Sequence, residues 1–286
     1  MIIKLALYIL GILGFWQLIF KANLFRGISI GKNRKELLIS ICNITAKSGH
    51  NVKLDVLPQY KFYTSLVENL YRFKAQFGVP VKATLMRIKR GIQQDDKMEN
   101  QLQAEKNSSY LQMSGIIVMT WFFVYYAMSI FSLPISRGIL YGIGLWQLIG
   151  LFLFMFIMNK LRKSYFAPYS LYFGKIYAWQ SLMDVGLPLG EINSKLELNH
   201  LLEDNSKRFE FIRRRMSEQI SNVHKYGNYN AEETEDIVDQ LWSMQEETFK
   251  RFQRVQSATK LIVIAIFFVS SYFAFLGALI LKLIKL

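Results

Sequence analysis

The chain has 286 residues, of which 52% are apolar and 20% are charged, and its 35 Lys and Arg exceed its 21 Asp and Glu to give a net charge of +14. So high an apolar content beside so many charges predicts a membrane protein with polar segments. A single cysteine, Cys42, and three scattered histidines exclude an intramolecular disulfide scaffold and a zinc module with the usual ligand spacing.

The first apolar segment, residues 1–20, is predicted to be transmembrane helix 1. Residues 5–20 hold no formal charge, and the ammonium of Lys4 can extend to the membrane interface. A cleaved signal peptide is the alternative, because the length of the segment suits one. The single lysine at its start, its aromatic core and the lack of a small-residue cleavage site before Lys21 favour an uncleaved span.

Residues 21–112 are predicted to form a first helical domain, because apolar residues recur in it at helical spacing. A run from Phe62 to Phe77 steps by three and four residues and then meets Gly78-Val79-Pro80. Glycine suits the left-handed position that closes a helix, and proline suits the first turn of the next helix. The sequence therefore predicts an αα-corner at Gly78 and Pro80, with a second helix beginning near Val81.

Residues 113–133 and 138–159 are predicted to be transmembrane helices 2 and 3. Both segments lack formal charges, and only a few residues around Arg137 separate them. So short a connection joins antiparallel neighbours, which makes the pair a tight hairpin. Gly138 and Gly142 form a G-x-x-x-G pattern, a small-residue face that suits helix packing within one chain or between chains.

Residues 160–260 are predicted to form a second helical domain with the same kind of corner, at Gly186-Leu187-Pro188. Farther along, Asn230 caps a long helix whose first turn carries Glu233 and whose apolar stripe runs toward transmembrane helix 4, residues 261–281. One continuous helix is expected there, and Ser270, Ala274 and Ala278 give its membrane part a small-residue ladder. The recurrence of the corner in each half makes a diverged duplication plausible.

The basic residues set the expected orientation. Residues 21–112 and 160–260 together hold 31 of the 35 Lys and Arg and all 21 acids, so both loops are predicted to be cytoplasmic and the N-terminus external. The net basicity is then mostly a matter of membrane topology, and nucleic acid is not an expected partner. The sequence thus predicts an all-α polytopic membrane protein with four transmembrane helices and two cytoplasmic helical bundles.

The sequence offers no candidate catalytic, cofactor-binding or metal-binding residues. Residues 27–33 resemble a phosphate-binding loop, but three residues separate the glycines where four are needed, and Asn33 replaces the hydroxyl that binds Mg²⁺. Asp95 and Asp96 lack a partner that would make them an acid–base pair, and a solvated helix surface is expected for them. We therefore expect no enzymatic activity.

Two basic runs are candidates for partner binding. The simpler interpretation is that these residues form a solvated face or contact anionic lipid headgroups. The alternative is that they dock an acidic protein partner. An apolar stripe that includes Phe209, Ile212 and Met216 lies on the opposite side of the second run. The candidate residues are Arg87, Lys89 and Arg90 in the first loop and Arg213, Arg214 and Arg215 in the second.

This layout resembles the type II secretion F-domain family, which supplies the inner-membrane platform proteins of type II secretion, type IV pili and tight-adherence pili. The resemblance covers nearly the whole chain in layout, and in residues it rests on Gly78-Val79-Pro80, Gly186-Leu187-Pro188 and the stretch 232–260. The size of the chain and its extra first span look more like the tight-adherence branch.

The resemblance implies a platform in the cell inner membrane without catalysis of its own. Such a platform sits on a cytoplasmic hexameric ATPase, passes motion to pilin or pseudopilin subunits drawn from the membrane, and associates with itself or with a related platform protein. The expected partners are therefore the motor ATPase, the pilin and membrane lipids. The alternative hypothesis is a membrane scaffold or signalling adaptor without a motor partner.

Overall fold

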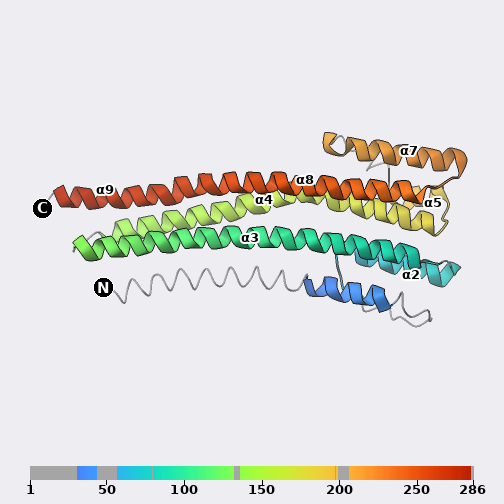
Figure 1. Ribbon diagram of the computed structural model, residues 1–286, viewed down its shortest axis with the longest axis horizontal. Helices are drawn as coiled ribbons and strands as arrows, with labels where there is room; N and C mark the ends of the chain where they lie inside the picture. Colours follow the sequence, from blue (N-terminus) through green and yellow to red (C-terminus); the bar gives the residue numbers. More distant parts are fainter. Residues whose placement is uncertain are drawn as a thin grey trace. The chain divides into compact units, whose positions relative to one another are not determined.

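The computed structural model describes residues 31–43, 57–78, 80–131, 136–196, 198 and 206–284 (Figure 1). Every regular element among these residues is helical, which confirms the all-α prediction for the described part of the chain. Transmembrane helix 1, predicted at residues 1–20, lies outside the described residues. The elements are a helix at 31–43, α2 (Tyr63–Phe77), α3 (Lys82–Phe131), α4 (Arg137–Asp184), α5 (Leu189–Leu196), a short 3₁₀ turn η2 (Lys207–Phe209), α7 (Glu210–Tyr226), α8 (Ala231–Val263), a π-helical turn η3 (Ile264–Val269) and α9 (Ser270–Ile284).

Three helices are long and apolar enough to cross a membrane: Lys82–Ile130, Arg137–Asp184 and Ala231–Ile284. They contain the described parts of the spans predicted at 113–133, 138–159 and 261–281. The expected boundaries at 112, 159 and 260 fall inside continuous helices. A change from polar to apolar residues alters the solvent that a helix prefers but leaves the backbone hydrogen bonds intact, so hydropathy alone does not end a helix.

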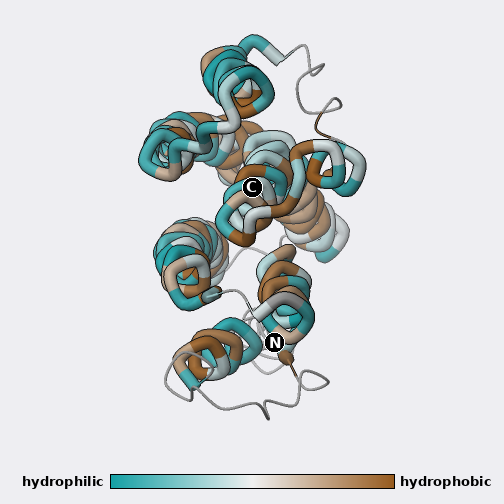
Figure 2. The backbone as a smooth tube through the Cα atoms, turned by 90° about the vertical axis from the view of Figure 1, so that its right-hand side faces the viewer, coloured by the Kyte–Doolittle hydropathy of each residue, from teal (hydrophilic) through white to brown (hydrophobic). Residues whose placement is uncertain are grey.

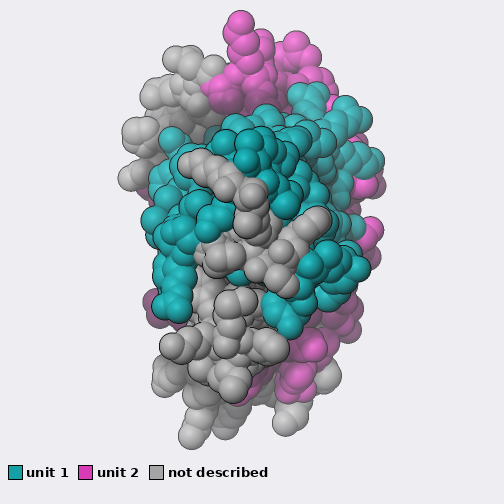
Figure 3. Space-filling view, turned by 90° about the vertical axis from the view of Figure 1, so that its left-hand side faces the viewer, with its two compact units in different colours: residues 1–20, 100–165, 248–286 teal, residues 21–99, 166–247 magenta. Residues whose placement is uncertain are grey.

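The chain divides into two compact units, coloured separately in Figure 3. The described residues of unit 1 come from Asn100–Tyr165 and Thr248–Leu286, and those of unit 2 come from Lys21–Glu99 and Phe166–Glu247. The two loops, expected as separate domains, therefore contribute to one unit. Each loop supplies a few amphipathic helices, and such helices are stable only when their apolar faces find a partner.

Unit 2 has an aromatic core. Trp179 is fully buried, and the ring of Tyr172 stacks on Phe209 with the centroids 4.2 Å apart. Tyr169 packs edge-on against Phe209 and donates its hydroxyl to the carbonyl of Met244 at 2.9 Å. These contacts bring α4, η2 and α8 together, and the hydropathy colours in Figure 2 show polar and apolar residues around the turns of single helices, as expected for amphipathic elements.

Unit 1 exposes large apolar side chains around a smaller apolar core. Phe154 and Phe275 are fully buried, whereas Met119, Phe156 and Phe273 have exposed fractions of 71%, 67% and 64%. Isolated exposed apolar residues are ordinary on a soluble protein, but a surface with many of them suits lipid or another apolar partner. The exposure in unit 1 therefore agrees with its membrane-like composition.

Candidate functional site

The first predicted corner lies in unit 2 and has the geometry that its sequence indicates. Gly78 closes α2 with φ of 66°, and its N–H donates to the carbonyl of Lys74 at 2.9 Å. Pro80 is exposed and precedes the first turn of α3. A Cβ built on Gly78 meets nothing within 4 Å, so the demand for glycine comes from the backbone conformation and not from crowding.

The second corner has the same conformation at its glycine. Gly186 has φ of 79°, and its N–H donates to the carbonyl of Met183 at 2.9 Å while Leu187 N–H donates to Leu182 at 3.2 Å. Pro188 then begins the next helix, because its carbonyl accepts the N–H of Ile192 at 3.2 Å. Both glycines predicted to have a positive φ therefore have one.

An ion-pair cluster, which we call the corner clasp, joins the segments that follow and precede these corners. Its members are Thr84 and Arg87 on α3, Asp184 at the end of α4 and Glu235 on α8. Arg87 donates from Nη1 to Asp184 Oδ2 at 2.6 Å and from Nε to Glu235 Oε1, and Thr84 Oγ1 donates to Asp184 Oδ2 at 2.8 Å. Three helices of unit 2 are thus held by one guanidinium, whose planar fork suits two carboxylates at once.

Arg87 is one of the predicted partner-binding residues, and the clasp gives it a role inside the chain. The same basic run places Lys89 at a half-buried position and Arg90 at an exposed one. Burial together with Glu235 and Asp236 raises the pKa of Asp239 on α8, and the charge of Arg90 opposes that rise. Of the three candidates in this run, Arg90 is the best exposed.

The run on α7 also separates into different environments. Arg213 donates to the carbonyl of Ser206 at 2.7 Å, and Arg215 lies 3.9 Å from Glu233 with only 19% of its side chain exposed. Arg214 has 67% of its side chain exposed and lies 3.9 Å from Glu218 on its own helix. Successive residues on a helix point about 100° apart, so three adjacent arginines do not form one free face.

The prediction for Asp95 and Asp96 is wrong. Asp95 is buried and accepts the Tyr60 hydroxyl at 2.5 Å and the ammonium of Lys61 at 2.7 Å, and Asp96 pairs with Arg34. Burial raises the pKa of Tyr60, and the charge of Asp95 adds to the rise, so the hydroxyl remains a donor. The partners come from residues 34 or more positions away in the chain, which is why the dipeptide itself gives no signal.

The start of α8 confirms the predicted cap. The side-chain oxygen of Asn230 accepts the N–H of Glu232 at 3.1 Å and that of Glu233 at 3.3 Å. The carboxylates of the first turn lie at the positive end of the helix dipole. Gln219 of α7 donates to Thr234 Oγ1 at 2.7 Å, which ties the preceding helix to this cap.

Polar side chains join the helices of unit 1 within its apolar segments. Trp121 of α3 donates from Nε1 to Gln147 Oε1 of α4 at 3.1 Å, and both side chains are buried. Trp146 of α4 donates to Ser270 Oγ at 3.1 Å, at the end of the π-helical turn η3. Interhelical hydrogen bonds of this kind fix the neighbours of a membrane helix where apolar contact alone does not.

A tight contact between α4 and η3 in unit 1 does not use the predicted small-residue pattern. Gly138 and Gly142 are exposed and have no atom of another helix within 4 Å of a built Cβ. Gly150 is buried, and its Cβ would meet Phe267 of η3 at 2.6 Å. The sequence pattern predicts packing at a pair of glycines, whereas this contact places one glycine opposite one aromatic ring.

The described residues offer little for cofactor or metal chemistry. Within them, no group of three His, Cys, Asp or Glu side chains is placed to hold a metal ion. A small cavity in unit 1 has a volume of about 30 Å³, room for roughly one water molecule.

No protein-family model, curated protein or solved structure matches the chain.

Proposed function

We propose that the chain is a non-catalytic inner-membrane platform that couples a cytoplasmic motor ATPase to the assembly of pilin or pseudopilin subunits. The observation that carries the proposal is that α3, α4 and the run from α8 to α9 each contribute residues to both compact units. A helix is a stiff connection whose hydrogen bonds are internal. Force applied to unit 2 can therefore pass along three covalently continuous helical segments into unit 1.

The corner clasp supports this coupling, because it joins all three helical segments within unit 2. It contacts α3 and α4 beside their corners and α8 near its first residue. Arg87 belongs to α3, Asp184 to α4 and Glu235 to α8, and one guanidinium joins all three. A motor that displaces any one of these helices in unit 2 would then displace the other two. Such a clasp suits a part that transmits motion better than one that only anchors a complex.

The apolar surface of unit 1 supports the other half of the proposal. Met119 and Phe122 on α3, Phe156 on α4 and Phe273 on α9 are among its exposed side chains. Pilin subunits leave the membrane by way of an apolar helix, as the resemblance implies, and such a helix needs an apolar surface beside which it can lie. Lipid covers the same surface when no pilin is present.

The orientation is the first point to test. Reporters fused after Lys47 and after Asn222 should both be cytoplasmic, and a reporter fused after Ser136 should be external, because the basic residues are concentrated in the two loops. A matched pair of reporters, one active only inside and one only outside, should give opposite signals at each site. An external signal at Asn222 would remove access of a cytoplasmic motor to the second loop.

The coupling itself is tested by purification from native membranes. The full-length tagged chain should retain a hexameric secretion ATPase and crosslink through Phe156 or Phe273, replaced by a photoreactive amino acid, to a pilin-like subunit. A crosslinker at the buried Phe275 is the matched control and should give no adduct. A scaffold or adaptor would retain other proteins and lack both the motor and the pilin adduct.

A further inference from the structure

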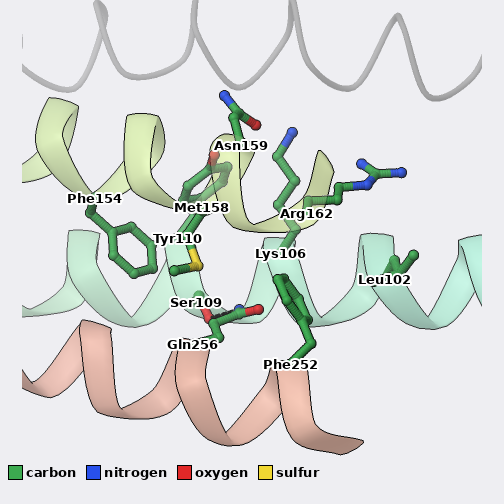
Figure 4. Close-up of a pocket in the computed structure, with 10 residues that line it drawn as sticks. All are labelled: Leu102, Lys106, Ser109, Tyr110, Phe154, Met158, Asn159, Arg162, Phe252 and Gln256. Atoms are coloured by element: carbon green, nitrogen blue, oxygen red, sulfur yellow. Dashed lines mark hydrogen bonds between the residues drawn. The ribbon is translucent and has the colours of Figure 1, made fainter. Parts of the chain in front are cut away.

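The cavity in unit 1 has a chemically divided lining, drawn in Figure 4. Lys106 of α3 and the pair Asn159 and Arg162 of α4 direct their polar ends to the same side of it. Met158 and Phe154 form an apolar wall, about one and two turns respectively before Arg162 on α4. The lining thus has a cationic end and an apolar end.

The remaining wall is well ordered by hydrogen bonds. Gln256 of α8 donates from Nε2 to Ser109 Oγ at 2.7 Å, and both side chains are buried. The ammonium of Lys106 lies 5.6 Å from the centre of the Tyr110 ring, a contact that restrains the lysine beside the cavity. The α3 and α8 walls of the cavity are therefore joined independently of anything bound there.

The position of the cavity along the sequence matches the edge of a membrane. Lys106 is the last charged residue before the span 113–133, and Arg162 follows the uncharged run 138–159 by three residues. Phe154 and Met158 belong to that uncharged run. Along α4, the cationic residue lies at the polar edge and the apolar residues lie deeper in the predicted span. A phospholipid has the same order, with its phosphate at the edge and its acyl chains deeper in the membrane.

The charge of unit 1 strongly favours an anion. The segments 100–165 and 248–286 contain 11 Lys and Arg and a single acid, Glu105. The carboxylate of Glu105 accepts a hydrogen bond from Gln253 Nε2 of α8 at 3.4 Å. Basic pockets between membrane helices bind the headgroups of anionic lipids, because the phosphate satisfies cations that lie at the polar edge of the bilayer.

We propose that this cavity binds the phosphate headgroup of an anionic phospholipid. Lys106 and Arg162 donate to the phosphate oxygens, and Asn159 adds an amide donor. The enclosed space admits one phosphate oxygen, and the rest of the headgroup lies at its mouth. Two cations favour phosphatidylglycerol over phosphatidylcholine, whose choline they repel. This lipid site goes beyond the platform function and needs neither motor nor pilin.

The test uses full-length protein in a neutral maltoside detergent, titrated with short-chain phosphatidylglycerol and followed by native mass spectrometry. Wild-type protein should bind this lipid at least about tenfold more tightly than short-chain phosphatidylcholine, since each cation near a headgroup contributes about fivefold. Lys106→Gln and Arg162→Gln should each weaken phosphatidylglycerol binding about fivefold, and the double variant should weaken it about 20-fold. The single variants keep the proposal testable if the double variant does not fold.

The matched control is Lys250→Gln/Arg251→Gln. This double variant removes the same charge from exposed positions of unit 1 that do not line the cavity. It should retain wild-type affinity for phosphatidylglycerol. Equal losses in the control and in Lys106→Gln/Arg162→Gln would overturn the site in favour of diffuse electrostatic attraction. Inorganic phosphate that displaces the lipid at equal concentration would overturn the lipid as occupant.

Discussion

At the residue scale, two glycines show how a short motif fixes a backbone. Gly78 and Gly186 adopt left-handed φ values of 66° and 79°, and neither has an atom within 4 Å of a built Cβ. There is therefore room for a side chain, but a residue with a Cβ atom is strained at this positive φ. The difference between room and conformation is what makes a glycine indispensable at a corner.

Replacement of either glycine by valine should destabilise unit 2. Gly78→Val and Gly186→Val should each lower the free energy of unfolding by about 1–3 kcal/mol, because a β-branched residue is strained at positive φ. The measurement is thermal unfolding of purified protein in detergent. Gly190→Val is the control, since Gly190 also has an open surrounding but no positive φ. Equal midpoints for the three variants would disprove the role of backbone strain.

The buried carboxylate of Asp95 is a second residue-scale case. Asp95→Ala leaves the Tyr60 hydroxyl and the Lys61 ammonium without their acceptor and should cost about 2 kcal/mol of stability. The exposed Asp236 provides the control, because Asp236→Ala should cost almost nothing. In a double-mutant cycle, Tyr60→Phe and Asp95→Ala should be coupled by more than the error of the measurement. Simple additivity would mean that the hydrogen bond adds no stability.

At the element scale, the sequence predicted helix identity well and helix length poorly. The G-x-P corners, the Asn230 cap and the apolar runs all carry local signals, and the structure has helix ends or helices at each of them. The lengths of α3 and α4 were missed because a span and the polar helix before or after it are one backbone element. Pro168 lies inside α4 without ending it, so a proline alone also gave no safe boundary.

The long-range contacts were missed for a different physical reason. Arg87 and Asp184 are 97 positions apart, and Trp121 and Gln147 come from different helices. A pattern along one helix reports which face is apolar but not which charged residue of another helix will face it. A basic residue within a mixed apolar stripe, as Arg87 is beside Leu85 and Ile88, is the signal that favours an internal ion pair.

Close packing of α4 against η3 gives an element-scale prediction. Gly150→Ala places a methyl group 2.6 Å from Cβ of Phe267, so the helices must separate or the ring must move. The expected cost is about 1–3 kcal/mol, which is typical of an overpacked interior. Gly142→Ala on the same helix has no neighbour within 4 Å and measures the gain in helix propensity alone. Thermal unfolding of both variants in detergent should place Gly150→Ala below and Gly142→Ala at or above wild type.

At the scale of the whole molecule, two sequence segments that each looked like a domain contribute to one compact unit. Their buried residues form a single apolar cluster that includes Leu70 from the first loop and Trp179 from the second. Their separation in the sequence by the predicted hairpin of spans suggests two bodies, because hydropathy reports the solvent of a segment and not its neighbours. A motor that contacts either loop would therefore act on the same unit.

The exposed basic side chain of Arg214 gives the prediction that tests docking at this scale. Reversal of all three arginines would confound docking with stability, since Arg213 and Arg215 make contacts inside unit 2. Arg214→Glu removes a weak ion pair with Glu218 and a cation–π contact with Phe211, both on its own helix, and should leave the fold intact. If α7 docks an acidic surface of the motor, this variant should weaken motor co-purification about fivefold or more, equivalent to about 1 kcal/mol, and the loss should depend on salt.

The control for Arg214→Glu is Lys97→Glu, which makes the same charge change at an exposed position of α3 in the same unit. It should leave motor binding unchanged, because docking depends on where a charge lies and not only on the total charge. Binding of both variants to vesicles that contain phosphatidylglycerol distinguishes contact with lipid headgroups from docking of the motor. Arg214→Glu protein that still retains the motor but binds these vesicles less would assign α7 to lipid headgroups. The platform proposal would then rest on the corner clasp and the helices that connect it to unit 1.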